Sequence, residues 1–130
     1  MRNRLKGDGG QALVEFALII PVLLFVLLAI AQFGDLYNHY VTITDATRAG
    51  ARAAVVSRTD PNPTGKAVQA VRDSATGLDQ TKLTVTVTPS PPWTTGQQVT
   101  ITASYPYSVD LVGLVVKSGS LTSTTKERVE

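Results

Sequence analysis

The 130-residue chain contains no cysteine and only one histidine, His39. The absence of cysteine excludes disulfide bonds and thiolate metal sites, and it leaves the cellular compartment undetermined. No base stands at motif spacing from Ser57 or Asp60, and the sequence has neither a glycine-rich phosphate loop nor a two-carboxylate signature. We therefore expect a protein that is not an enzyme and that carries no cofactor and no metal, with His39 as a solvated or interfacial side chain.

Excess positive charge is confined to the first ten residues. The formal net charge is +2, but residues 1–10 hold three of the 12 Lys and Arg residues and one of the 10 Asp and Glu residues. The rest of the chain carries nine of each sign and is formally neutral. This part of the chain thus lacks the excess of positive charge that favours nucleic-acid binding, and we expect no nucleic-acid partner.

Charged residues are absent from residues 16–34, which are strongly apolar. At about 1.5 Å per helical residue this run is long enough to cross a hydrocarbon core, and residues 11–34 are predicted to be a transmembrane helix. Three basic residues precede the run, whereas Arg48 is the first Lys or Arg after it. The positive-inside rule then puts the N-terminus in the cytoplasm and residues 35–130 outside it. The three basic residues are Arg2, Arg4 and Lys6.

Two residues are unusual in and beside this run. Glu15 is the only charged residue between Asp8 and Asp35. A carboxylate in lipid costs a few kcal/mol, so Glu15 is a candidate functional residue, although it could also lie solvated and without a partner at headgroup level. Pro21 removes the hydrogen bond to the Ala17 carbonyl and is predicted to kink the helix.

After the predicted membrane segment, apolar residues continue at helical spacing. Further along the chain they alternate with polar residues, as in strands. A helix is predicted at residues 35–58, ended by a segment with two prolines and a glycine, and a shorter helix at 66–76. Alternating apolar and Thr or Ser residues predict strands at 82–88 and 97–105, and a third strand is placed at 120–129. The apolar residues 109–116 are expected to cover a sheet edge, because they are too few to cross a membrane.

These elements predict an α+β fold in which a long N-terminal helix and a second short helix pack against a small antiparallel sheet of about three strands. One face of the sheet needs a helix surface to pack against, which we call the floor of the sheet. We assign it to a face of small side chains on the long helix. That face consists of Ala46, Ala49, Gly50, Ala53 and Ala54. Arg48 and Arg52 share a helix face with Asp45, which predicts an intrahelical ion pair. Trp93, in the proline-rich loop between the first two strands, is expected to cap the sheet.

The sequence around Gly10 resembles a known processing site. Residues 9–16 read Gly-Gly-Gln-Ala-Leu-Val-Glu-Phe, so a short basic leader ends in Gly10 and Glu15 is the fifth residue after it. This arrangement resembles the leader of type IV pilins and pseudopilins. A closer resemblance is to TadE-like proteins, which are minor pilins or pseudopilins of the tight-adherence (Tad/Flp) pilus and secretion systems. It rests on Ala-Leu-Val-Glu-Phe-Ala-Leu at 12–18, Pro21, Gln-Phe-Gly at 32–34 and Ala-Thr-Arg-Ala-Gly-Ala-Arg at 46–52.

The resemblance implies a type IV pilin-like fold with a cytoplasmic leader at residues 1–10 and an extracytoplasmic head. It implies cleavage between Gly10 and Gln11 by a prepilin peptidase, an aspartic peptidase of the membrane, and methylation of the new N-terminus. Further implied partners are other pilin or pseudopilin subunits, an inner-membrane assembly platform and membrane lipid. Phe16, where major Flp pilins carry Tyr, and the long head favour a minor subunit in the bacterial inner membrane.

Cleavage gives Glu15 a partner that the precursor lacks. The freed α-amino group of Gln11 is cationic near neutral pH, and in a bundle of subunit helices it can pair with Glu15 of a neighbour. Two other interpretations remain open. Ala29-Ile30-Ala31 matches a signal-peptidase pattern that would release a soluble protein beginning at Gln32. Alternatively, the head is a membrane-tethered or exported binding module unrelated to pili.

Overall fold

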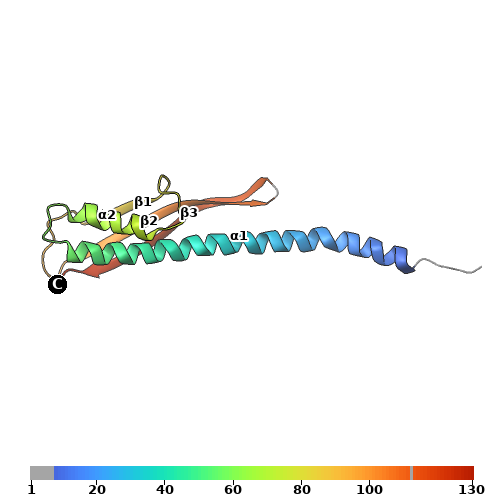
Figure 1. Cartoon of the computed structure of the whole chain (residues 1–130), viewed down its shortest axis with the longest axis horizontal. Coiled ribbons are helices and arrows are strands. Elements are labelled where there is room, and N and C mark those ends of the chain that lie inside the picture. Colours follow the sequence, from blue (N-terminus) through green and yellow to red (C-terminus); the bar gives the residue numbers. More distant parts are fainter. Residues whose placement is uncertain (1–7, 112) are drawn as a thin grey trace, which may run out of the picture.

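The computed structural model describes residues 8–111 and 113–130 and has the expected α+β architecture. Helix α1 (Asp8–Val56) is followed by helix α2 (Pro63–Ser74) and by strands β1 (Thr84–Thr88), β2 (Gln98–Leu111) and β3 (Leu114–Arg128). Figure 1 shows a small head built around the C-terminal part of α1, from which the N-terminal part of the helix projects. The basic residues of the predicted leader lie outside the described residues.

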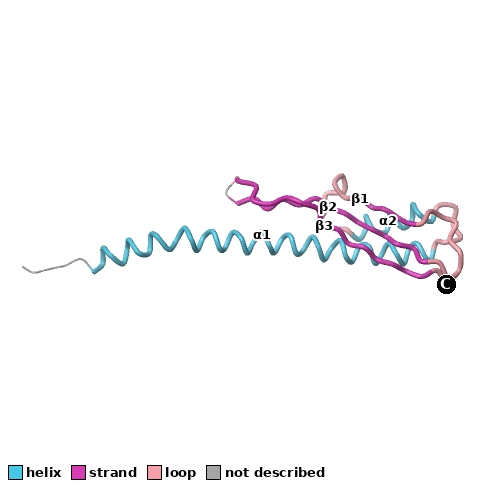
Figure 2. Tube along the Cα trace, turned by 180° about the vertical axis from the view of Figure 1, so that it is seen from behind, coloured by secondary structure: helices cyan, strands magenta, loops and turns pink. Residues whose placement is uncertain are grey.

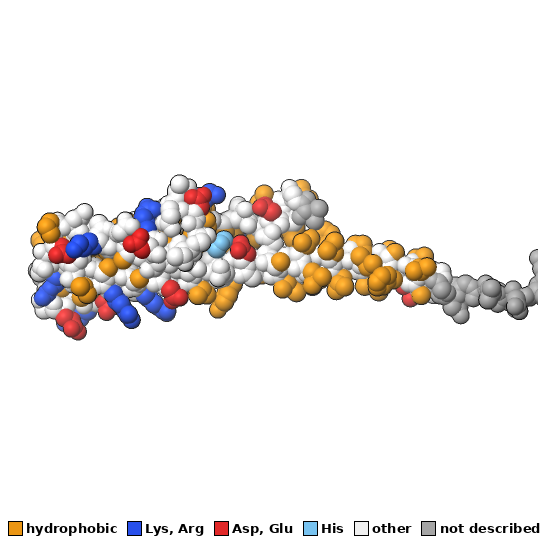
Figure 3. All heavy atoms as spheres, in the orientation of Figure 1, with side chains coloured by type: hydrophobic (Ala, Val, Ile, Leu, Met, Phe, Trp, Pro, Cys, Tyr) orange, Lys and Arg blue, Asp and Glu red, His pale blue; other side chains and the backbone are white. Residues whose placement is uncertain are grey.

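The projecting part of α1 is apolar and exposed, whereas the other part of the helix is packed into the head. Large apolar side chains from Leu13 to Phe33 are exposed, and Ile43 is the first fully buried residue of the helix. Figure 3 shows these apolar side chains covering the projecting helix, while charged side chains gather on the head. Within the described residues, α1 is the one helix that is long and apolar enough to cross a membrane. It runs through Pro21 without a break, and the kink there stays a prediction.

The sheet is antiparallel with strand order β1-β2-β3, and both helices cover the same face of it (Figures 1 and 2). The predicted two-residue period of β2 is confirmed, because Val99, Ile101 and Ala103 are fully buried between partly exposed Thr residues. From the helix side, Ala46 and Ala54 are fully buried against them, as expected for a floor of small residues. Ala49 and Ala53, placed on the same face from the sequence, are only half-buried.

Gly50 sets how closely α1 and α2 approach each other. A Cβ atom added at this position would overlap Cγ2 of Val71 and would lie 3.2 Å from the carbonyl oxygen of Ala67, both on α2. Glycine is therefore required here by the close approach of the second helix rather than by backbone conformation. The contact holds the short helix α2 closely against α1.

Helix α2 begins three residues earlier than predicted. The predicted helix stop includes both prolines of the loop, but Pro63 is the first residue of α2, where a missing N–H costs nothing. Asn62 caps the helix, since its Oδ1 accepts a hydrogen bond of 2.8 Å from the Gly65 amide. The loop that follows α1 thus also supplies the cap and the first residue of α2.

The interpretation of residues 109–116 as a cover for a sheet edge is wrong. Strands β2 and β3 continue through this segment and pair as far as Leu111 and Leu114, with a register shift between Val109 and Asp110. Gly113, with φ of 81°, takes a backbone conformation that other residues adopt at a cost. Because β1 pairs only as far as Ser104, the last part of β2 and β3 forms a two-stranded hairpin beyond the three-stranded sheet.

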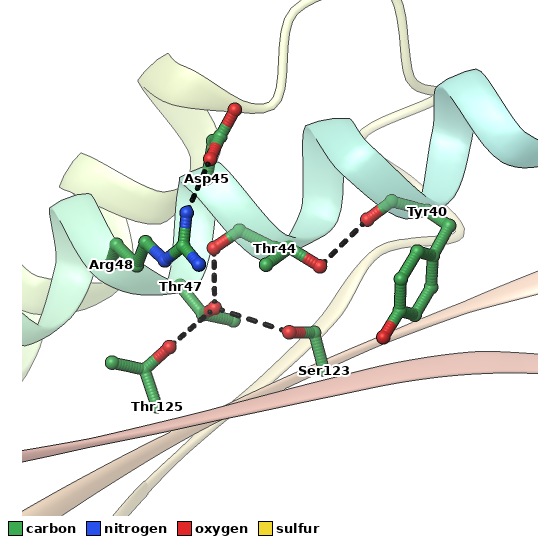
Figure 4. Close-up of polar contacts among 7 residues, drawn as sticks. All are labelled: Tyr40, Thr44, Asp45, Thr47, Arg48, Ser123 and Thr125. Carbon is green, nitrogen blue, oxygen red and sulfur yellow. Dashed lines mark hydrogen bonds and ion pairs between the residues drawn. The ribbon is translucent and has the colours of Figure 1, made fainter.

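A buried hydroxyl cluster joins α1 to β3 (Figure 4). Thr47 is fully buried, and its Oγ1 donates to the Thr44 carbonyl at 2.9 Å. Its remaining lone pairs face the hydroxyls of Thr125, at 2.9 Å, and Ser123, at 3.4 Å, which are then the donors. The cluster satisfies polar groups that burial would otherwise penalise, and it fixes the register between helix and strand.

Candidate functional site

The residues predicted for processing and assembly lie at the projecting end of α1. Gly10, Gln11, Glu15 and Phe16 are all exposed. A side chain at Gly10 would meet nothing within 4 Å, so no packing inside the chain requires glycine there. The bond between Gly10 and Gln11 lies in the first turn of α1, where backbone N–H groups have no helical acceptor. This end of the helix is thus accessible to another protein.

Glu15 is not isolated, because it is hydrogen-bonded within its own helix. The side-chain amide of Gln11 donates to Oε1 of Glu15 at 3.0 Å, as residues four apart on a helix can. The Glu15 carboxylate therefore lies over the turn that contains Gln11. Sequence reasoning paired Glu15 with the α-amino group of residue 11 in another subunit and did not identify this contact within one chain.

A second contact region lies at the opposite end of the apolar run, and sequence reasoning missed it. The Gln32 side-chain amide donates to the backbone carbonyl of Asp110 at 3.0 Å, joining α1 to the β2–β3 hairpin. Beside this bond is a mainly apolar groove of about 290 Å³ between helix and hairpin. It is lined by Ala29, Phe33 and Leu36 of α1 and by Tyr107, Val109, Leu111, Val116 and Lys117 of the hairpin. The contact joins residues 78 apart in the chain, so no local pattern could reveal it.

His39 lies just beyond this groove and is partly covered by the sheet. Its ring packs edge-on against Tyr105, with centroids 5.6 Å apart, and its Nε2 is 3.7 Å from Oδ1 of Asp35. The side chain is 24% exposed, so it is interfacial rather than fully solvated. In residues 8–111 and 113–130, no group of three or more His, Asp or Glu side chains could hold a metal ion.

Other residues that the sequence singles out make contacts within the folded chain. Arg48 and Asp45 form the predicted intrahelical ion pair, with 3.1 Å between Nη1 and Oδ1, on the outer face of α1 (Figure 4). Trp93 is buried in the hydrophobic core of the head, and its indole N–H donates to the Pro89 carbonyl of the same loop at 2.8 Å.

The loop between α2 and β1 contains one carboxyl group with a shifted pKa. The hydroxyl and the backbone N–H of Thr81 both donate to Asp79 and lower the pKa of Asp79 below its ordinary value of 3.8. The nearby charge of Lys82 acts in the same direction. The shift therefore follows from a local turn in the loop and does not mark a catalytic cleft.

Comparison with protein families finds a match in the N-terminal part of the chain. Residues 10–52 match the family described as TadE-like protein. No curated protein and no solved structure matches the chain. The matched segment begins at Gly10, includes Glu15 and Pro21, and ends within the packed half of α1. The resemblance to TadE-like proteins predicted from the sequence is thereby confirmed for residues 10–52.

Proposed function

We propose that the protein is a membrane-anchored minor pilin or pseudopilin that acts in assembly of a Tad-type (type IVc) pilus or a related secretion apparatus. The observation that carries the proposal is the TadE-like match over residues 10–52. The division of α1 supports it, because one part of the helix presents apolar side chains to its surroundings and the other part is the floor of a folded head. The apolar part of such a helix can contact lipid before assembly and the helices of other subunits in a bundle afterwards.

The proposed membrane arrangement is a single pass in the bacterial inner membrane. The N-terminus is cytoplasmic and the head is extracytoplasmic, with residues 1–10 as the leader. The proposed partners are a prepilin peptidase that cleaves between Gly10 and Gln11, other pilin or pseudopilin subunits, the assembly platform of the inner membrane and membrane lipid. The role is structural and requires no catalytic residue, cofactor or metal.

Glu15 is proposed to set the register between neighbouring subunits. Within one chain its carboxylate already accepts a hydrogen bond from the neutral Gln11 amide. Cleavage creates an α-ammonium group on the same residue, and an ammonium-carboxylate bond is roughly twice as strong as a neutral hydrogen bond. A carboxylate has two oxygens with several acceptor positions, so Glu15 can bind the ammonium group of a neighbour without losing the contact to its own Gln11. Such a pair in an apolar bundle contributes specificity more than net stability.

The test is to replace Glu15 in cells that assemble the apparatus. Glu15→Ala is expected to insert and to be cleaved but to fail to enter assemblies, because the ammonium group of a neighbouring subunit then has no counter-charge. Glu15→Gln keeps the size and one acceptor oxygen of the side chain but removes the charge, so it is expected to fail as well. Asp45→Asn, which changes an exposed carboxylate on the same helix, is the control and is expected to assemble.

Assembly is measured by co-purification and by cross-linking between the Gln11 regions of two subunits. Normal co-assembly of Glu15→Ala would contradict the proposed pairing. Replacement of residues 11–34 by an unrelated anchor separates the proposal from the alternative of a tethered binding module. A pilus subunit is expected to lose its function with the foreign anchor, whereas a binding module would keep it.

A further inference from the structure

The β2–β3 hairpin leaves the sheet and runs beside the membrane-length half of α1 (Figures 1 and 2). The pairing of β1 with β2 ends at Ser104, but β2 and β3 stay paired as far as Leu111 and Leu114. The hairpin therefore projects as two strands without a third neighbour. It points from the head toward the end of α1 that contains Gly10.

The tip of the hairpin lies level with the outer part of the apolar run. Its position on the helix is fixed by the hydrogen bond from Gln32 to the Asp110 carbonyl and by the groove that Ala29 shares with Leu111. Gly34 is the last residue before Asp35 and marks the outer end of the uncharged run. Ala29 is five residues further in, which at 1.5 Å per residue is about 7 Å below that end.

The side chains of the tip are aliphatic and exposed. Leu114, Val115 and Val116 are 73%, 64% and 62% exposed. Successive strand residues point to opposite faces, so three consecutive aliphatic residues make both faces of the ribbon apolar. A water-exposed antiparallel ribbon would instead alternate apolar and polar residues. Asp110 and Lys117 flank the tip, where the long lysine side chain can place its ammonium group among lipid headgroups.

We propose that the hairpin tip, made of Leu111 and residues 113–116, inserts into the outer leaflet of the membrane that α1 spans. The head would then contact lipid at two points, which fixes its orientation relative to the bilayer. The inference rests on the proposed membrane span of α1. The tip is continuous with the exposed apolar surface of that helix, and its depth agrees with the roughly 5–10 Å at which apolar groups are buried at a membrane interface.

Shallow insertion is also compatible with the backbone of the hairpin. The facing edges of the two strands pair with each other, as at Val109 and Lys117. Their outer edges carry N–H and C=O groups that the hydrocarbon core would leave without partners, so deep insertion is excluded. At the level of the headgroups these groups can bond to water.

Because the chain has no cysteine, single-cysteine variants can report the position of the tip directly. Leu114→Cys and Val115→Cys would each be labelled with the fluorophore NBD in the full-length protein and reconstituted into phosphatidylcholine vesicles. Lipids brominated near the headgroup end of the acyl chain quench a label at shallow depth. Thr122→Cys, also exposed on β3 but on the head side of the hairpin, is the matched control. Leu24→Cys, in the middle of the apolar run, reports the span of α1 separately.

Labels at 114 and 115 are expected to emit at shorter wavelength and to be quenched at least twofold more than the label at 122. No quenching at 114 and 115, with strong quenching at 24 by lipids brominated deep in the chain, would overturn the inference and leave the anchor intact. Loss of quenching at 24 as well would overturn the proposed membrane span with it. A blue shift that disappears when the protein is diluted with lipid would assign the tip to a second copy of the chain and would also overturn the inference.

Discussion

Replacement of Gly50 by alanine tests the packing that holds the head on α1. The added methyl group would overlap Cγ2 of Val71 and would lie 3.2 Å from the Ala67 carbonyl and 3.5 Å from Cγ2 of Ile101. Val71 is fully buried and β-branched, so its side chain cannot rotate away at low cost. Overpacking of this kind costs about 1–3 kcal/mol, and the better helix propensity of alanine returns about 1 kcal/mol. Because a backbone carbonyl as well as Val71 stands in the way, we take the upper part of that range, about 2–3 kcal/mol, and expect a net loss of roughly 1–2 kcal/mol in the free energy of unfolding of the head.

The only tryptophan gives a specific signal for this measurement. Trp93 is buried in the head, so its fluorescence shifts to longer wavelength when the head unfolds, whereas the projecting half of α1 contributes no tryptophan signal. Urea unfolding in a mild detergent would be followed by this emission. Gly34→Ala is the matched control, since it brings the same gain in helix propensity but its Cβ would meet nothing within 4 Å; it should unfold at the urea concentration of the wild type or be more stable by up to about 1 kcal/mol. Unfolding of Gly50→Ala at the same urea concentration as the wild type, or at a higher one, would refute the reasoning.

Two further predictions concern single polar groups in the head. Thr47→Val keeps the side-chain volume but removes the hydroxyl that Ser123 and Thr125 contact, and we expect a loss of about 1–3 kcal/mol in the same urea assay; an unchanged midpoint would contradict the role given to this cluster. The pKa of Asp79 should be below 3.8, and Thr81→Val should raise it by removing the hydroxyl donor, as measured by NMR titration of the Asp79 carboxyl. Because the folded-state pKa is the lower one, any stability from this group is present above pH 3.8 and is lost as the pH falls through the folded-state pKa.

The spacing of apolar residues predicts best those elements that leave a pattern in their own sequence. The uncharged run at 16–34 predicts the exposed half of α1, and alternation around Ile101 predicts β2, because burial of one face leaves a direct trace in the order of residues. Pro63 was misassigned because proline both ends a helix and begins one, and the choice depends on the cap at Asn62.

Contacts between distant segments could not be predicted in this way. The hairpin tip lacks the alternation of a strand, because both of its faces are apolar. Its partner, Gln32, lies 78 residues earlier in the chain than Asp110. The hydroxyl cluster is similar, since Thr47 has the spacing of a core residue and its polar partners come from β3. In both cases the partner residue is distant in the sequence and is brought into contact by the tertiary fold.

The N-terminus of the mature protein tests the proposed function most directly. Intact mass and N-terminal sequencing of the protein from membranes of cells with an active prepilin peptidase should show a chain that begins at Gln11, with residues 1–10 removed. That result provides the ammonium group with which Glu15 is proposed to pair. A chain that begins at Gln32, or one that retains the leader in assembled material, would contradict the proposal, because the ammonium group at residue 11 would then not exist.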